Sequence, residues 1–363
     1  MKDIEEQYIV GVDLGGTEVK AAISDNSGIL YRVKQPVSKE KDKLALPDQI
    51  HNIIRYIRSK VKIPVNRKKI IKHAIYGIGI GTPGPFLQEK GHTTIYADNL
   101  AIKGIPMEKR LAEHWGYSNV IIENDLGAKV WGMGRLQLIR GMKQHDIGVM
   151  NPGTGYGTDA IIKFRDIETG EISYGKILGK NGNGMEAGHE VIFPNHNSRC
   201  KCGNFGDLEI MASGSGMERR YFAKAGKKAS CKEIFDLYKN DRNAREVVDD
   251  SIKANGIAIA NLTNVLDTKT WYVIGNPIKD YTEAMIKKLN GHVMKSNPKI
   301  MLKDIRIIVA NKGSPYEKLE EYASAVGSTS LVMPKSWVKI WNRERPWEHM
   351  PEAEKLPADF FRK

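Results

Sequence analysis

The stretch YIVGVDLGGTEVKAAISD, residues 8–25, combines two short apolar runs with a pair of glycines between them. Apolar runs of this length that are bounded by turn residues are typical of buried strands, so the stretch predicts two strands joined by a tight turn. The turn residues DNSG follow, and then ILYRVKQPV (29–37), which we interpret as a third strand. Because glycine lacks a Cβ, the N–H groups of DLGGT (13–17) can approach an anion closely.

The same pattern returns later in the chain. Residues 146–164, DIGVMNPGTGYGTDAIIKF, again predict a strand, a glycine turn and a strand. The apolar patterns elsewhere predict helices at 46–61, 107–116 and 244–266 and strands at 74–81, 119–125 and 270–275. This mixture of strands and helices indicates an α/β protein, and the repeated unit indicates two related lobes.

The composition is that of a soluble globular protein. The chain has 363 residues and a net charge of +13; its first segment, MKDIEEQ, is acidic, and no apolar run approaches the length of a membrane helix. Three cysteines, of which Cys231 stands apart, do not form a disulfide framework. We therefore expect a cytoplasmic protein with no membrane partner. Its lysines and arginines are scattered, so we interpret them as a solvated surface and expect no nucleic-acid partner.

Both glycine turns are candidates for binding phosphate. DLGGT and GTGYG (153–157) each follow an apolar strand and combine glycines with a threonine hydroxyl, but neither contains the lysine of a P-loop. Either one alone is more often a plain turn, whereas two in one chain favour the phosphate hypothesis. Asp13, near the end of its strand, could hold a water bound to Mg²⁺ or orient the phosphate end of a nucleotide.

A second candidate is END (123–125), where another apolar strand ends. In an open α/β sheet, a carboxylate at the carboxyl end of a strand points into the crevice where ligands bind. The alternative is a helix N-cap, because Asn and Asp are favoured there and LGAKVWGMG can begin a helix. Both can hold together, with Asn124 as the cap and Asp125 reaching a substrate hydroxyl.

The segments EAGHE (186–190) and CKCGNFGDLE (200–209) bring together four candidate metal ligands, which are His189, Cys200, Cys202 and Asp207. Structural zinc is usually bound by Cys and His, and Asp is an acceptable oxygen ligand. The alternatives, a degraded zinc site and a surface turn with two reduced thiols, remain open.

In this order and at about these separations, DLGGT, GTPGP (81–85), END, GTGYG and EAGH followed by CxCGxxG resemble the motifs of the ROK family, named for repressors, open reading frames and kinases. The resemblance extends from residue 8 to about residue 331. Characterised enzymes of this family are mostly ATP-dependent sugar kinases with the two-lobed actin-like ATPase (ribonuclease H-like) fold, which has its ligand cleft between the lobes. The resemblance thus implies an N-terminal lobe at 1–125, a C-terminal lobe at 126–331, whose last helix can return to the N-terminal lobe, and a tryptophan-rich extension at 332–363.

The resemblance also implies roles for matching residues. Asp125 matches the catalytic base that takes the proton from the sugar hydroxyl. The residues that match sugar contacts are Asn99, Asn124, Glu186, His189 and Glu209. Those that match the nucleotide site, which binds ATP with Mg²⁺, are Asp13, Gly15, Gly16, Thr17, Gly153, Thr154, Gly155, Gly157 and Gly275. The family's zinc ligands are one His and three Cys, which match His189, Cys200, Cys202 and, in place of the third cysteine, Asp207. We expect Zn²⁺ to be bound.

The implied activity is transfer of the γ-phosphate of ATP to a hexose, glucose-like by default. The alternatives are a kinase for an amino sugar, an N-acetylhexosamine or a cyclitol, and a non-catalytic sugar sensor. A repressor of this family would carry a DNA-binding helix-turn-helix ahead of DLGGT, where only about a dozen residues stand. By analogy with the family we expect a homodimer.

The chain departs from the family pattern at NLAIKG (99–104) and GNP (275–277), which loosens any statement about the preferred sugar or nucleotide. It also adds the extension, which carries Trp337, Trp341 and Trp347. Because tryptophan is costly to leave in water, we expect the extension to pack on the protein's own body or on a second subunit.

Overall fold

The computed structural model describes residues 8–61, 75–89, 92–97, 100–139, 146–180, 182–296 and 303–361. The chain divides into two compact units, the first made of Met1–Lys143, Leu178–Gly184 and Glu321–Lys363 and the second of Gln144–Ile177 and Met185–Glu320. Within the described ranges, every helix is too short or too polar to span a bilayer.

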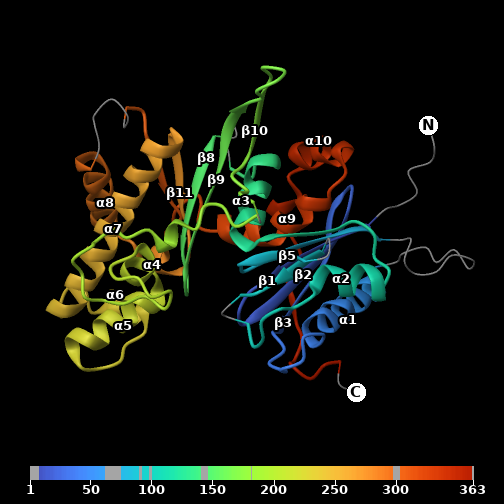
Figure 1. Ribbon diagram of the computed structural model, residues 1–363, viewed down its shortest axis with the longest axis horizontal. Coiled ribbons are helices and arrows are strands. Elements are labelled where there is room, and N and C mark those ends of the chain that lie inside the picture. The colour runs from blue at the N-terminus through green and yellow to red at the C-terminus, as the bar shows by residue number, and fades with distance from the viewer. Residues whose placement is uncertain are drawn as a thin grey trace, which may run out of the picture. The chain divides into compact units, whose positions relative to one another are not determined.

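The first unit is built on a six-stranded sheet with the strand order β13-β3-β2-β1-β4-β7 (Figure 1). Strands β1, β2 and β3 form an antiparallel meander, whereas β4 and β7 run parallel to β1. The bounds are β1 Tyr8–Leu14, β2 Glu18–Asp25, β3 Gly28–Pro36, β4 Ile75–Thr82, β7 Val120–Asn124 and β13 Glu354–Lys355. A separate pair of strands, β5 Phe86–Glu89 and β6 His92–Ile95, follows β4. The expected strands near the N-terminus and at 74–81 and 119–125 are therefore confirmed.

Helix α1 (Ala45–Lys60) packs on β2 and β3 and buries four isoleucines in the core of the first unit. The helix expected at 107–116 is only partly α-helical, because α2 (Met107–Lys109) passes into a π-helical turn, η2 (Arg110–His114). There the Trp115 N–H donates to the carbonyl of Arg110, five residues earlier, and the segment ends at Gly116 with a positive φ. Helix α3 (Asp125–Arg135) follows β7 directly.

Helix α9 (Leu319–Val332) lies very close to the sheet of the first unit. A Cβ on Gly79 of β4 would stand 1.9 Å from the carbonyl oxygen of Ser328, and one on Gly11 of β1 would stand 2.2 Å from Oγ1 of Thr329. The glycines of YIVGVDL and IYGIGIGT therefore let a helix backbone approach the two central strands.

The extension continues the first unit. It contains α10 (Lys335–Glu344), the 3₁₀ turn η5 (Pro346–His349) and β13, which pairs in parallel with β3. Trp337, Trp341 and Trp347 are all buried, and Nε1 of Trp341 donates to the carbonyl of Asp25 at 3.1 Å. The expectation that the extension packs on the protein's own body is confirmed.

The expected division of the chain at residue 125 differs from the structural one. Helix α3 packs on β4 and β7, so it stays with the first unit. Most of α9 belongs to that unit too, as the expected return of the last helix allowed.

The second unit has a five-stranded sheet with the order β10-β9-β8-β11-β12 (Figure 1). The bounds are β8 Ile147–Pro152, β9 Tyr156–Arg165, β10 Ile172–Lys176, β11 Thr270–Val273 and β12 Arg306–Val309. The helices are α4 Leu208–Ala212, α5 Gly214–Ala225, α6 Cys231–Asp236, α7 Arg242–Leu266 and α8 Glu283–Lys295, with the 3₁₀ turns η3 Ala187–His189 and η4 Asn276–Asp280. The repeat predicted at 146–164, which consists of a strand, a glycine turn and a strand, is confirmed, and so is the long helix predicted at 244–266.

Candidate functional site

The first glycine turn joins β1 to β2 in the first unit. The Gly15 N–H donates to the carbonyl of Glu18 at 3.0 Å, which closes the turn, while Gly16 is half-buried and Thr17 is exposed. Asp13 lies just before the turn and forms an ion pair with Lys20 of β2 at 3.6 Å. The backbone of the turn is thus fixed by its own hydrogen bond and reaches solvent at Thr17.

Asn124 and Asp125 mark the junction of β7 and α3. Oδ1 of Asn124 accepts hydrogen bonds from the N–H groups of Leu126 (3.0 Å) and Gly127 (3.4 Å), so Asn124 is the N-cap of α3. Oδ1 of Asp125 accepts from the Leu126 N–H at 2.8 Å. The capping interpretation is correct for Asn124, and it leaves the carboxylate of Asp125 at the first residue of the helix.

Strand pairing brings Asp13 and END to the same end of the sheet. Asp13 of β1 pairs with Gly81 of β4, and Gly81 pairs with Glu123 of β7. All three strands are parallel, so Asp13, near the end of β1, and Asp125, directly after β7, lie at the same end of the sheet. The structure of the first unit therefore gathers the first glycine turn and Asp125 at that end.

Two charged neighbours act on the pKa of Asp125 in opposite directions. Burial raises the pKa of the Asp125 carboxyl above its ordinary value, and the Asp13 carboxylate raises it further, whereas the Lys129 ammonium lowers it. Lys129 lies one helical turn further along α3 and is only 7% exposed. Sequence reasoning missed Lys129, although the i, i+4 spacing from Asp125 would have placed both on one face of a helix.

In the second unit, the turn between β8 and β9 is held chiefly by helices α4 and α5. Gly153 carries one hydrogen bond inside the turn, from its N–H to the carbonyl of Gly155 at 2.8 Å. The Gly214 N–H donates to the carbonyl of Gly153 at 2.8 Å, and Oγ of Ser215 donates to the carbonyl of Thr154 at 2.7 Å. Two carbonyls of the turn, those of Gly153 and Thr154, thus accept hydrogen bonds from the first residues of α5.

Gly275 follows β11 beside this turn. Its φ is +108°, and a Cβ there would stand 2.1 Å from the carbonyl oxygen of Pro152, at the end of β8. The structure thus brings the end of β11 next to the start of the second glycine turn, and only glycine fits that approach.

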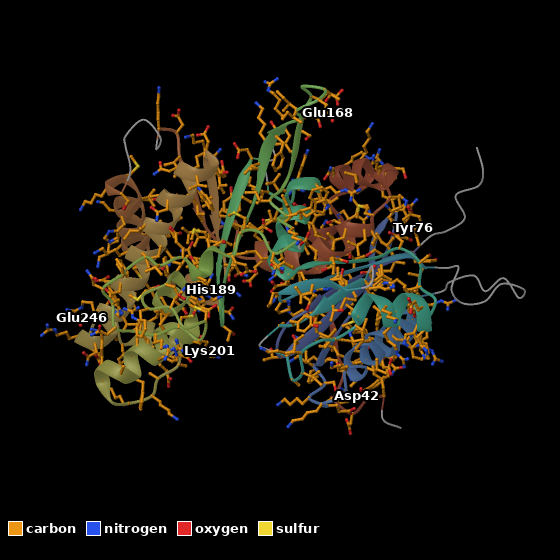
Figure 2. All side chains as sticks on the ribbon, in the orientation of Figure 1. Asp42, Tyr76, Glu168, His189, Lys201 and Glu246 are labelled. Carbon is orange, nitrogen blue, oxygen red and sulfur yellow. The ribbon has the colours of Figure 1, made fainter. Side chains whose placement is uncertain are left out.

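The four candidate metal ligands converge in the second unit, where Figure 2 labels His189 and Lys201, the residue between the two cysteines. The ligand atoms of His189, Cys200, Cys202 and Asp207 all lie within 4.8 Å of one another. Nδ1 of His189 is 3.5 Å from Oδ2 of Asp207, and Sγ of Cys202 is 3.2 Å from the same oxygen. In a tetrahedral zinc site the ligand atoms stand about 3.3–3.8 Å apart, as follows from metal–ligand bonds of about 2.0–2.3 Å. The donor set and its spacing therefore fit zinc after a small contraction.

Asp207 has a second task, as the N-cap of α4. Its Oδ1 accepts from the Ile210 N–H at 2.9 Å, while its Oδ2 faces the cluster. Burial acts to raise the pKa of Asp207, but hydrogen bonds from His189 and Ile210 outweigh it, so that the pKa is lowered. The same contact with Asp207 raises the pKa of His189, and burial raises that of Cys200. Bound metal would have to displace these protons, as zinc does when it binds thiols and imidazole.

Of the residues expected to contact sugar, Asn124 lies in the first unit and Glu186, His189 and Glu209 lie in the second; Asn99 lies outside the described residues. Glu186 directly precedes η3, and the N–H of Ala187 donates to Oγ1 of Thr158 on β9. Glu209 lies in the first turn of α4, and its Oε2 accepts from the Tyr156 N–H at 3.1 Å.

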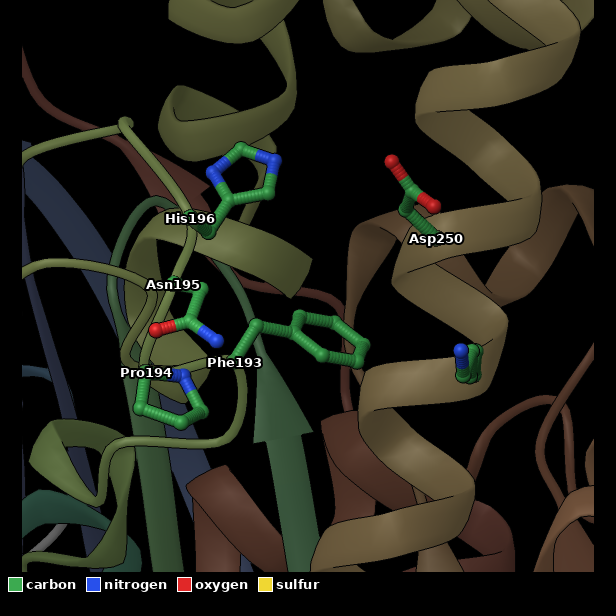
Figure 3. Close-up of a pocket in the computed structure, with 6 residues that line it drawn as sticks. Phe193, Pro194, Asn195, His196 and Asp250 are labelled. Atoms are coloured by element: carbon green, nitrogen blue, oxygen red, sulfur yellow. The ribbon is translucent and has the colours of Figure 1, made fainter.

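An open pocket of about 340 Å³ also lies in the second unit (Figure 3). A loop lines one side, and its Phe193 ring points toward α7, from which Nζ of Lys253 stands 5.3 Å from the ring centroid. The full lining is Phe193, Pro194, Asn195, His196, Asp250 and Lys253. None of the predicted site residues belongs to it.

The chain is similar to known proteins over most of its length. A sequence model described as the ROK family matches residues 9–333. A glucokinase of Halalkalibacterium halodurans is 27% identical over 80% of this chain and 86% of its own length. An N-acetyl-D-glucosamine kinase of Haemophilus influenzae is 24% identical over 79% of this chain and 90% of its own length. The crystal structure of a ROK hexokinase from Thermus thermophilus, 23% identical, superposes with a TM-score of 0.65 over 88% of this chain and 97% of its own.

Proposed function

Because the chain belongs to the ROK family, we propose that it is an ATP-dependent sugar kinase of the actin-like ATPase fold, which transfers the γ-phosphate of ATP to a hydroxyl group of a hexose. The observation that carries the proposal is the half-buried carboxylate of Asp125 at the start of α3. It follows a parallel strand at the edge where β1 delivers the first glycine turn. In this position, Asp125 can act as a base next to phosphates bound at the first glycine turn.

Asp125 acts as the general base in the proposed reaction. Phosphoryl transfer depends chiefly on positioning and on stabilisation of charge, so a sugar hydroxyl in line with the γ-phosphorus needs little covalent assistance. As the hydroxyl oxygen bonds to phosphorus, its proton passes to the Asp125 carboxylate and ADP leaves. Lys129 favours the ionised form of Asp125, which is the form that can accept a proton.

The glycine turns bind the phosphates through backbone N–H groups. Thr17 and Thr154 would add hydroxyl donors, and Asp13 would help to hold a hydrated Mg²⁺ ion, which would supply positive charge to the γ-phosphate. The end of β11 at Gly275 stands beside the second turn and forms part of the adenosine site.

When bound, zinc would connect η3, which ends at His189, to the segment that leads into α4, whose first turn carries Glu209. His189, Cys200, Cys202 and Asp207 hold it, as the convergence of their ligand atoms supports. Because Nδ1 of His189 faces the cluster, Nε2 is the ring nitrogen that contacts a sugar hydroxyl. Asn124, Glu186 and Glu209 provide further sugar contacts in this proposal.

The acceptor is glucose-like by default, because the glucokinase relative covers most of both chains. The N-acetyl-D-glucosamine kinase relative supports the second candidate, an N-acetylhexosamine. Sugars that differ at one hydroxyl are separated by single polar contacts, so the panel of acceptors has to be wide.

The test is ADP release from MgATP with glucose, mannose, glucosamine, N-acetylglucosamine, N-acetylmannosamine, fructose and a cyclitol. With the preferred acceptor, Asp125→Asn should reduce kcat by about 10²–10⁴-fold while sugar affinity stays within a few fold. The exposed Asp236→Asn is the matched control and should turn over like the wild type. No ADP release with any acceptor, or full turnover in Asp125→Asn, contradicts the proposal.

A further inference from the structure

Glu209 contacts both the second glycine turn and the metal cluster of the second unit. Its Oε2 accepts the hydrogen bond from the Tyr156 N–H at 3.1 Å, at the exit of the second glycine turn. Its Oε1 is the acceptor for the thiol of Cys200, with Sγ at 3.6 Å. One carboxylate therefore spans the turn and the metal cluster.

The turn is shaped to receive this carboxylate. A Cβ on Gly155 would stand 2.9 Å from Oε2 of Glu209, which is too close for any residue but glycine unless the carboxylate moves. The remaining support of the turn comes from Gly214 and Ser215 at the start of α5, which follows α4 after one residue. The turn's conformation thus depends on α4 and α5 more than on its own internal bond.

The same helix also carries a member of the cluster. Asp207 caps α4 through its bond with the Ile210 N–H and faces His189 and Cys202 with its other oxygen. Asp207 and Glu209 are two residues apart, so a change at the cluster that moves the start of α4 also moves the carboxylate that holds the turn.

We propose that Glu209 is a positioning residue for the second glycine turn, and that it transmits the state of the metal cluster to the turn's affinity for nucleotide phosphates. The inference rests on the proposed kinase function and deepens it. Glu209 then has a role in nucleotide binding that does not require sugar.

The physical basis is preorganisation. A phosphate gains most from backbone N–H groups that already point toward it, because ordering a loose turn on binding costs affinity. Removal of the Glu209 carboxylate releases the Tyr156 N–H and leaves a turn that has to be ordered by the ligand. We expect binding to weaken about tenfold, which corresponds to about 1.4 kcal/mol.

The experiment is calorimetric titration with the non-hydrolysable ATP analogue AMPPNP and Mg²⁺, in the absence of sugar. Glu209→Ala should bind about tenfold more weakly than the wild type, and Glu209→Gln, which keeps an acceptor oxygen, should lose less. The exposed Asp236→Asn is the control and should bind like the wild type. Thermal unfolding of each variant verifies that it is folded.

A second arm uses the wild-type protein with zinc loaded or removed by a chelator. Removal should weaken AMPPNP binding in the wild type, whereas in Glu209→Ala it should produce little further loss, because the connection is already broken. The wild-type half of this arm needs no substitution, so it tests the link to the cluster even where Glu209→Ala fails to fold, and Glu209→Gln then tests the positioning role.

The outcomes separate the possibilities. Normal AMPPNP binding by Glu209→Ala overturns the positioning role, and a wild-type affinity that ignores metal overturns the link to the cluster. If the wild type itself binds no AMPPNP, the proposed kinase function fails instead.

Discussion

Gly79→Ala tests the close packing of α9 on the sheet that carries Asp125. The new Cβ would stand 1.9 Å from the Ser328 carbonyl oxygen, and real contacts of this kind do not fall below 3.0 Å, so the two must separate by about 1.1 Å. The oxygen belongs to a helix backbone and cannot rotate away. The Cβ of Leu331, at 3.2 Å, restricts movement in another direction.

The expected cost is about 2–3 kcal/mol. Overpacking of a tight core costs about 1–3 kcal/mol, and a shift of α9 also weakens the bond from the Gly81 N–H to Oγ of Ser328, which is 3.1 Å long. The matched control is Gly291→Ala in α8, where a Cβ meets nothing within 4 Å. There alanine should stabilise the protein by about 0.5–1 kcal/mol, since it is the better helix former.

The assay is urea unfolding followed by tryptophan fluorescence, because five of the six tryptophans lie in the first unit. With a slope of about 2 kcal/mol per M, Gly79→Ala should lower the midpoint by about 1–1.5 M, while Gly291→Ala leaves it unchanged or slightly higher. An unchanged midpoint for Gly79→Ala would refute the argument that a glycine is needed for the approach of α9.

Three further substitutions give distinct expectations. Lys129→Met removes the charge that lowers the pKa of Asp125, so the acidic limb of kcat/KM should move to higher pH; loss by the same factor at every pH would instead indicate a purely structural role. Trp341→Ala empties a fully buried position and removes a hydrogen bond, so it should cost about 3–5 kcal/mol in denaturant unfolding, and a loss below about 1 kcal/mol would contradict the docking of the extension. Asp207→Cys should tighten zinc binding in a competition titration yet lower the midpoint of thermal unfolding of the metal-free protein, because sulfur replaces the cap of α4; equal stability of the two metal-free proteins would show that the cap contributes nothing.

The sequence predicted the strands well because they are short apolar runs between strong turn signals. The segments YIVGVDL and IYGIGIGT gave β1 and β4 within a residue or two, whereas the close approach of α9 to the glycines of the second segment was not predicted. The π-helical turn after Lys109 was not predictable, since a π-helical turn has the same local pattern as an α-helix.

Within the candidate sites, features that depend on spacing along one helix or one strand could be predicted from the sequence. Contacts between segments far apart in the sequence could not. The cap by Asn124 follows from its place before a helical pattern. The bond from the Tyr156 N–H to Glu209 joins residues 53 apart in the sequence, and no periodicity reports such a contact. The parallel pairing of β13 with β3 is of the same kind, because it depends on where the extension crosses the sheet.

Asp207 shows why replacement of a cysteine in the metal motif is more than the loss of a ligand. A carboxylate has two oxygens, and here Oδ1 caps α4 through Ile210 while Oδ2 faces His189 and Cys202. A thiolate has one ligand atom and is not a preferred N-cap, so a cysteine would bind the metal more strongly but leave the first N–H groups of α4 without that partner. Because α4 also carries Glu209, the cap by Asp207 supports the start of this helix in addition to any bound metal. Compared with cysteine, the aspartate therefore binds metal more weakly. In return, the start of α4 and the glycine turn that Glu209 contacts depend less on the metal.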